Sequence, residues 1–269
     1  MESIQLSNGM TMPLIGLGTW DLNGQECVKM VKTALQLGYR LVDTAQMYGN
    51  EQAVGEGIRQ SGIPRSEIFV TTKIYRPSAS YEKARAAIDV SLARLGLTYV
   101  DLLLLHEPYQ AGPQMYRALE EAYAQGKVRA IGISNYDENW YRTFLKQCTI
   151  KPMVNQLETH IFYQRANFQR EMAAEGTMLQ AWAPLAQAKT NLTTHPVLVR
   201  IGQAHGKRAA QVALRFLVQR GISVIPKTRH EARLKENLAL FDFTLSDAEM
   251  QSIEALDQAK TFFPWTLAF

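Results

Sequence analysis

Short apolar runs alternate with longer amphipathic segments along nearly the whole chain. Each short run is typical of a buried strand, and each longer segment repeats its apolar residues at the spacing of a helix. The segment that follows Asn23, for example, places Val28, Val31 and Leu35 on one helical face and stops at Gly38. This alternation predicts a parallel sheet in which a helix follows each strand.

The pattern predicts eight such strand–helix units. The strands are expected at 14–18, 41–45, 69–74, 100–105, 130–134, 153–157, 178–183 and 223–226. The second helix is expected to carry Val54 and Ile58 and to end before Gly62. The other helices are expected at 24–37, 81–95, 113–126, 139–148, 166–174, 197–204, 209–220, 230–240 and 247–256. Eight units imply closure into a (β/α)₈ TIM barrel, an α/β fold. A short hairpin that turns at residues 7–9 is expected before the first strand.

An open doubly wound sheet is the alternative arrangement of alternating strands and helices. Its nucleotide-binding versions carry Gly-x-Gly-x-x-Gly after the first strand. Here Gly16-Leu17-Gly18 continues as Thr-Trp-Asp, so the third glycine is missing. The barrel is therefore preferred, as a single domain over residues 1–269 without an internal linker.

Composition narrows the class of protein. The chain has 269 residues, 46% of them hydrophobic, and a net charge of +4 without a run of like charges, so nucleic-acid binding is not expected. The N-terminus lacks the pattern of a signal peptide, and no apolar run is long enough for a membrane span. Cys27 and Cys148 suggest neither a disulfide framework nor a cysteine-ligated metal site. We expect a cytoplasmic monomer without a metal.

Polar residues stand where several predicted strands end. Asp43 and Tyr48 follow the second strand, Lys73 ends the third, and His106 follows the fourth. Each alone is more often a turn, surface or packing residue. Active sites of such barrels lie at the carboxyl ends of the strands, so these four side chains are expected to converge there.

This group suits the reduction of a carbonyl, which needs a hydride on carbon and a proton on oxygen. A tyrosine with a pKa near its usual value of about 10 is a reluctant acid. The ammonium of Lys73 is expected to stabilise the phenolate and to bring the pKa of Tyr48 toward the working range. Asp43 would orient the lysine, and His106 would polarise the carbonyl.

The same residues lie in motifs that resemble those of the aldo-keto reductase family. These motifs are residues 42–51, Thr72-Lys73, residues 102–108, residues 132–136 and residues 225–237, and the resemblance extends over about 16–257. It is closest to compact microbial members such as the diketogluconate and methylglyoxal reductases. The resemblance implies a catalytic tetrad of Asp43, Tyr48, Lys73 and His106, with Tyr48 as the general acid.

The resemblance also implies a site for NADPH. It places the nicotinamide amide against Ser134, Asn135 and Gln156, and the nicotinamide ring on Trp182. The residues that match those holding the 2′-phosphate and the adenine are Lys227, Thr228, Arg233, Glu236 and Asn237. Selection of NADH would favour an acidic residue instead, for which the nearby candidates are Glu231 and Glu236.

The expected substrate is a small carbonyl compound, and its pocket is predicted from fewer signals. Many family members follow the catalytic histidine with Trp-Pro, whereas this chain has Glu107-Pro108. Trp20, Met47, Tyr48 and Glu107 are the expected lining. The tail aromatics are either part of the pocket or a cap on the barrel; they are Phe262, Phe263 and Trp265.

Two other functions remain open from the sequence. Lys73 could form a Schiff base in a lyase, although a fixed carboxylate partner such as Asp43 favours a permanently charged lysine. The chain could also be a regulatory barrel that keeps the cofactor site and has little turnover. Retention of all four tetrad residues argues against that second alternative.

Overall fold

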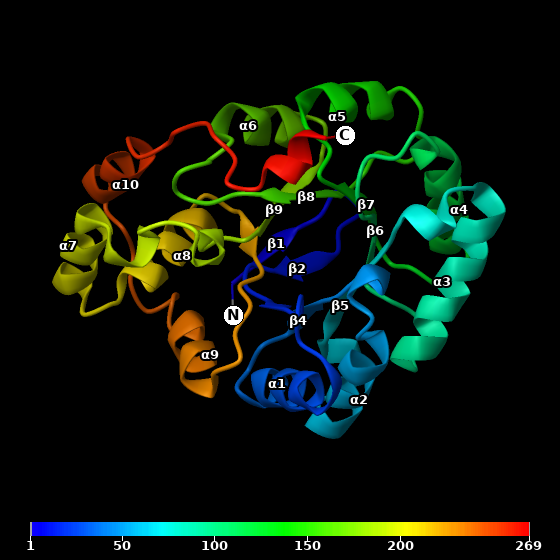
Figure 1. Cartoon of the computed structure of the whole chain (residues 1–269), viewed down its shortest axis with the longest axis horizontal. Helices are drawn as coiled ribbons and strands as arrows, with labels where there is room; N and C mark the ends of the chain where they lie inside the picture. The colour runs from blue at the N-terminus through cyan, green and yellow to red at the C-terminus, as the bar shows by residue number, and fades with distance from the viewer. Residues whose placement is uncertain (1, 269) are drawn as a thin grey trace.

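Eight parallel strands form one sheet in the computed structural model, which describes residues 2–268 (Figure 1). Neighbouring strands follow the order of the chain. They are β3 (Leu17–Gly18), β4 (Leu41–Asp43), β5 (Phe69–Ile74), β6 (Leu102–Leu105), β7 (Ile131–Ser134), β8 (Val154–Glu158), β9 (Met178–Trp182) and β10 (Ser223–Val224). This order is what a chain of strand–helix units produces when each strand pairs with the next one.

Backbone hydrogen bonds between the first and last strands close the sheet into a barrel. Ile15 forms a parallel bridge with Val224, just before β3 begins. The amide of Gly16 donates to the carbonyl of Val224 at 2.9 Å, and the amide of Gly18 donates to the carbonyl of Pro226 at 3.2 Å. The predicted (β/α)₈ barrel is confirmed.

The helices surround the barrel (Figure 1). They are α1 (Gly24–Gln36), α2 (Glu51–Ser61), α3 (Tyr81–Leu95), α4 (Gly112–Ala124), α5 (Glu138–Leu145), α6 (Ala166–Ala174), α7 (Pro196–His205), α8 (Ala209–Gln219), α9 (Glu231–Leu238) and α10 (Asp247–Glu254). Local sequence explains their ends: Ser80 and Ser246 cap α3 and α10 with their side chains. Gly62 and Gly96 end α2 and α3 with positive φ.

The predicted hairpin closes the amino-terminal end of the barrel. Strands β1 (Ser3–Gln5) and β2 (Thr11–Pro13) pair antiparallel around the turn at residues 7–9. The hydroxyl of Ser223, at the start of β10, donates to the carbonyl of Pro13 at 2.9 Å. The buried side chain of Met12 fills the interior from this end. The hairpin and the side chain of Met12 therefore cover the amino-terminal end of the barrel.

Many strand residues are buried and apolar, and buried polar residues also stand at the carboxyl ends of the strands. All four residues of β6, for example, are buried leucines, whereas Lys73, near the end of β5, and His106, just after β6, are buried polar residues. In the described part of the chain, no helix is long and apolar enough to cross a membrane.

Candidate active site

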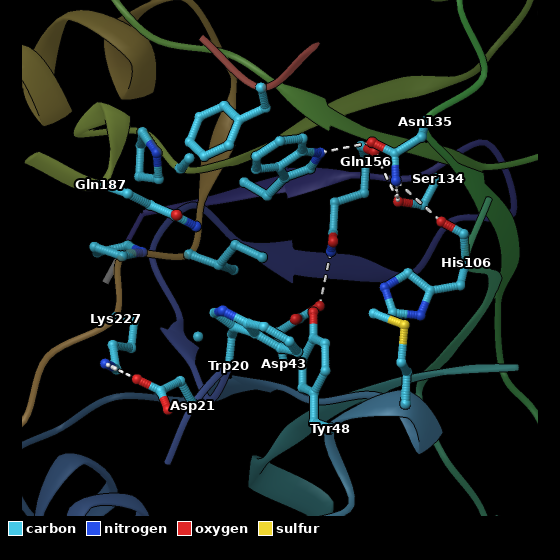
Figure 2. A pocket seen from close by; sticks show the side chains of 18 of the residues that line it. Trp20, Asp21, Asp43, Tyr48, His106, Ser134, Asn135, Gln156, Gln187 and Lys227 are labelled. Carbon is cyan, nitrogen blue, oxygen red and sulfur yellow. Dashed lines mark hydrogen bonds and ion pairs between the residues drawn. The ribbon is translucent and has the colours of Figure 1, made fainter. Parts of the chain in front are cut away.

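A cavity of about 660 Å³ opens at the carboxyl ends of the strands (Figure 2). This volume is in the range of pockets that hold small molecules and cofactors. Its lining includes most of the residues predicted from the sequence: Trp20, Asp43, Met47, Tyr48, His106, Glu107, Ser134, Asn135, Gln156, Trp182, Lys227, Phe263 and Trp265. Lys73 is fully buried beneath this lining.

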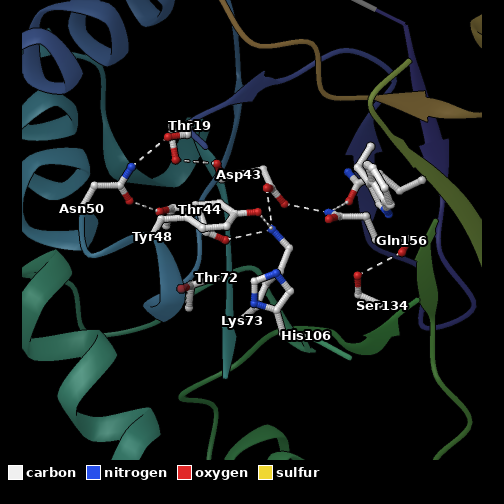
Figure 3. A network of polar contacts seen from close by, with 12 residues as sticks. Thr19, Asp43, Thr44, Tyr48, Asn50, Thr72, Lys73, His106, Ser134 and Gln156 are labelled. Atoms are coloured by element: carbon white, nitrogen blue, oxygen red, sulfur yellow. Dashed lines mark hydrogen bonds and ion pairs between the residues drawn. The ribbon is translucent and has the colours of Figure 1, made fainter. Parts of the chain in front are cut away.

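Asp43, Lys73 and Tyr48 form one connected group (Figure 3). The Nζ of Lys73 donates to Oδ1 of Asp43 at 2.6 Å, to the carbonyl of Thr44 at 3.0 Å and to Oη of Tyr48 at 3.3 Å. The three donors of an ammonium are thereby all used. The geometry holds one positive charge directly behind the Tyr48 hydroxyl.

The loop after β4 fixes Tyr48 in place. A short 3₁₀ turn, Gln46–Tyr48, ends at Gly49, whose φ of 66° is left-handed. The side chain of Asn50 donates to the carbonyls of Thr19 and Leu22, both at 2.8 Å, and its Oδ1 accepts from the Thr44 hydroxyl at 2.6 Å. This buried amide therefore joins the loops that follow β3 and β4.

The buried side chains of Asp43 and Lys73 form an ion pair. Burial raises the pKa of Asp43, while the charge of Lys73 and its hydrogen bond oppose that rise. Burial by itself would lower the pKa of Lys73, but Asp43 and Tyr48 outweigh it and raise the pKa of the ammonium. A Schiff-base lysine must lose its proton to attack a carbonyl, so these surroundings do not favour a lyase.

The pKa of Tyr48 differs from the sequence-based expectation. Burial raises this pKa above the usual value, and the ammonium of Lys73 reduces the rise without reversing it. The expected net lowering is therefore wrong, because the extent of burial cannot be read from the spacing of residues. Tyr48 stays protonated at neutral pH and can donate a proton, while Lys73 stabilises the anion left behind.

His106 is a neutral imidazole at the edge of the same group. Its ring centroid lies 5.6 Å from that of Tyr48, and burial, together with the charge of Lys73, lowers its pKa well below 6.5. Its Nδ1 is buried without a hydrogen-bond partner among residues 2–268. An unpaired acceptor costs less than an unpaired N–H, so the proton belongs on Nε2, from which His106 can donate into the pocket.

Ser134, Asn135 and Gln156 line the wall of the cavity near His106 (Figure 2), and Trp182 belongs to the same lining. Nε1 of Trp182 donates to Oδ1 of Asn135 at 2.9 Å, and Nδ2 of Asn135 donates to the carbonyl of His106 at 3.1 Å. Nε2 of Gln156 donates to Oδ2 of Asp43 at 2.7 Å. Within residues 2–268 no donor bonds Oε1 of Gln156, so this wall offers a free acceptor that fits a carboxamide N–H.

Lys227 lies at the opposite end of the pocket, beside Asp21 (Figure 2). Its Nζ is 3.4 Å from Oδ2 of Asp21, and Arg229 bonds the same carboxylate at 3.0 Å and Glu26 at 2.9 Å. Arg229 and Lys227 lower the pKa of Asp21. The sequence-based search for acidic residues near this end missed Asp21, because some 206 positions of chain separate it from Lys227.

The other predicted cofactor residues lie around α9, outside the cavity lining. Arg233 is exposed in the first turn of this helix. Thr228 is buried and its hydroxyl accepts the amide of His230 at 3.1 Å, which is the bond of a local turn. Glu236 pairs with Arg208 at 3.5 Å, and Asn237 is buried at the end of the helix.

The predicted pocket residues Trp20, Met47, Tyr48 and Glu107 all line the cavity. The ring of Trp20 lies 5.0 Å from that of Tyr48, and Glu107 accepts the hydroxyl of Tyr109 at 3.2 Å. The ring centroid of Phe263 lies 4.9 Å from that of Trp182. The ring of Trp265 stacks on Trp182, with the centroids 5.6 Å apart.

Of the three tail aromatics, Phe263 and Trp265 line the pocket, whereas Phe262 does not. Its ring stacks on His160 at 5.2 Å, and its amide donates to the buried carboxylate of Glu158 at 2.9 Å. Phe262 therefore packs against His160 and Glu158, and not in the cavity that Phe263 lines.

Comparison with known proteins identifies the family. The model of the aldo/keto reductase family matches residues 14–258. The chain belongs to the aldo/keto reductase family. It is 42% identical to glyoxal reductase of Bacillus subtilis over 268 residues, which cover 98% of this chain and 95% of that protein. It is 40% identical to morphine 6-dehydrogenase of Pseudomonas putida, over 94% of this chain and 90% of that protein.

A solved structure of the family has the same fold. An aldo-keto reductase from a Medee basin deep-sea metagenome library superposes with a TM-score of 0.95, at 40% identity, over 97% of both chains. Membership supports an oxidoreductase that acts on carbonyl compounds with a nicotinamide cofactor.

Proposed function

We propose that this chain reduces small aldehydes, α-dicarbonyls or ketones to alcohols with NADPH, and that Tyr48 donates the proton. One observation carries the proposal: the Tyr48 hydroxyl faces a cavity and is 3.3 Å from a lysine that is buried against Asp43. A protonated phenol backed by a fixed positive charge is a suitable general acid. The relation to a glyoxal reductase supports small carbonyl substrates.

The residues divide the reaction between them. Bound reduced nicotinamide supplies the hydride to the carbonyl carbon. Tyr48 donates its proton to the carbonyl oxygen, so that hydride and proton together convert the carbonyl into an alcohol. Lys73 stabilises the resulting phenolate, and Nε2–H of His106 holds the carbonyl oxygen toward Tyr48. Asp43 keeps Lys73 charged and oriented.

We further propose that Ser134, Asn135, Gln156 and Trp182 hold the nicotinamide, and that Lys227 and Arg233 hold the 2′-phosphate. A phosphate with two negative charges favours an arginine fork and lysine charges. Thr228, Glu236 and Asn237 are proposed to contact the phosphate and the adenine. The exposed guanidinium of Arg233 at the start of α9 is well placed to select NADPH over NADH.

Titration of both cofactors tests this assignment. Quenching of tryptophan fluorescence gives Kd for NADPH and NADH with the wild type and with Arg233→Ala. The variant is expected to lose about 1.5–3 kcal/mol of NADPH binding, which is typical of a hydrogen bond to a charged group, and almost none of NADH binding. Equal losses for both cofactors would show that Arg233 does not read the 2′-phosphate.

Turnover is tested with a panel of aldehydes and dicarbonyls. Consumption of NADPH with a matching yield of alcohol supports a reductase. Tight binding of NADPH without consumption of any of these carbonyls would favour the regulatory barrel instead.

A further inference from the structure

A row of buried polar side chains crosses the barrel interior below the pocket. Gln156 on β8 is the register partner of Gln180 on β9, and Gln180 is the register partner of Ser223 on β10. Gln180 and Ser223 have no exposed surface. Barrel interiors are usually filled by branched apolar residues, and a buried amide costs free energy unless it is hydrogen-bonded.

Each member of the row donates a hydrogen bond to the next acceptor. Nε2 of Gln156 donates to Oδ2 of Asp43 at 2.7 Å and to Oε1 of Gln180 at 2.8 Å. Nε2 of Gln180 donates to Oγ of Ser223 at 3.3 Å, and it also lies 3.8 Å from Sδ of Met12. The hydroxyl of Ser223 donates to the carbonyl of Pro13 at 2.9 Å. The row therefore runs from the Asp43 carboxylate to the closing hairpin.

The two ends of the row determine the orientation of both amides. The carboxylate of Asp43 and the carbonyl of Pro13 can only accept hydrogen bonds. The single hydrogen of Ser223 is used on Pro13, so Ser223 must accept from Gln180, which turns Oε1 of Gln180 toward Gln156. A flipped Gln180 would set two N–H groups against each other. A flipped Gln156 would set its oxygen against the Asp43 carboxylate.

We propose that Gln180 is a positioning residue of the reductase site, which acts together with the Asp43 carboxylate to hold the Gln156 amide in place. In this orientation Nε2 of Gln156 stays on Asp43, and Oε1 is left to accept from the carboxamide of the nicotinamide. The inference rests on the proposed function, since it assigns one free acceptor to the bound cofactor. Gln180 itself touches neither Asp43 nor the pocket.

The experiment replaces Gln180 by leucine, which has a similar volume and no hydrogen-bonding group. Kd is measured by fluorescence quenching for NADPH and for 2′-phosphorylated ADP-ribose, the same molecule without the nicotinamide. Gln180→Leu is expected to weaken NADPH on the order of tenfold, as loss of one oriented hydrogen bond does. Binding of the fragment is expected to change less than about twofold, because Gln156 lies at the nicotinamide end.

A matched control separates this effect from a loss of buried polar contacts in general. Gln164 is also buried, and its Nε2 donates to the carbonyls of Ile161 and Ile253 at 2.7 and 2.9 Å, outside the pocket lining. Gln164→Leu should lower stability and leave the ratio of the two Kd values unchanged. Ser223→Ala, which removes the group that orients Gln180, should shift that ratio in the same direction as Gln180→Leu and by less.

The outcomes are distinct. An unchanged Kd for NADPH in Gln180→Leu, or an equal loss for NADPH and the fragment, overturns the inference alone. If Gln180→Leu does not fold, Ser223→Ala decides by the same ratio. A wild-type protein that does not bind NADPH overturns the proposed function and this inference together.

Discussion

Removal of the Lys73 charge is expected to destabilise the protein strongly. In Lys73→Met the carboxylate of Asp43 stays buried, and Gln156 remains its hydrogen-bond donor among the described residues. Breaking a buried ion pair from one side costs about 3–5 kcal/mol. The free energy of unfolding of Lys73→Met, measured in urea, is expected to fall by this amount at neutral pH.

An exposed ion pair of the same length is the control. Lys127 and Asp89 are also 2.6 Å apart, but their side chains are 39% and 61% exposed, against 0% and 2% for Lys73 and Asp43. Lys127→Met should cost less than about 1 kcal/mol, because solvent screens this pair. A larger loss of stability in Lys73→Met than in Lys127→Met would therefore result from burial of the pair and not from the distance between its charges.

Two further measurements on the same pair sharpen the prediction. Asp43→Asn combined with Lys73→Met removes both charges, and we expect it to recover at least about 1 kcal/mol relative to the sum of the single changes. In Lys73→Met the pKa of Asp43 rises further in the folded state. As the pH falls, folded Asp43 is therefore protonated before unfolded Asp43, and the stability difference between the variant and the wild type becomes smaller. A loss below about 1 kcal/mol in Lys73→Met, or additive single changes, would refute the reasoning.

Two other predictions follow from the charges at the site. Asp21→Asn should tighten NADPH a few fold, and less in high salt, because Asp21 neutralises Lys227 and Arg229; an unchanged Kd in calorimetric titration would contradict this. The pKa of His106 is depressed in the folded state. When the pH falls below 6.5, the unfolded state therefore binds a proton that the folded state does not, and the free energy of unfolding decreases. The free energy of unfolding of the wild type and of His106→Gln is measured in urea from pH 7 to pH 5. The wild type should lose up to about 1.4 kcal/mol per pH unit more than the variant does.

The sequence predicts the framework of the barrel well, because the hydrophobic periodicity is strong. Strand 69–74 and helix 166–174 are confirmed at both ends. Other ends differ by a few residues. The last strand was expected to reach Pro226 and stops at Val224, since Pro226 has no N–H to continue the ladder. The turn of the hairpin and the helix ends at Gly62 and Gly96 were predicted, because each depends only on residues that are neighbours in the sequence.

The site was predicted where it depends on strand ends, and not where it depends on packing across the barrel. Strand ends bring Asp43, Lys73 and His106 together in any barrel. The pairing of Asp21 with Lys227 and the row through Gln180 join residues far apart in the chain, and no local pattern indicates them. The rise in the pKa of Tyr48 depends on its burial, which only the folded structure shows.

The most direct test of the account is turnover of Tyr48→Phe. Consumption of NADPH is followed with a small dicarbonyl such as glyoxal, and Kd for NADPH is measured in parallel. Tyr141→Phe is the control, because Tyr141 bonds Thr177 outside the pocket lining. General acid catalysis contributes about 10²–10⁴ in rate, so Tyr48→Phe should lose at least about a hundredfold in kcat with Kd nearly unchanged. A variant that keeps more than about a tenth of the wild-type kcat would contradict the assignment of Tyr48 as the proton donor.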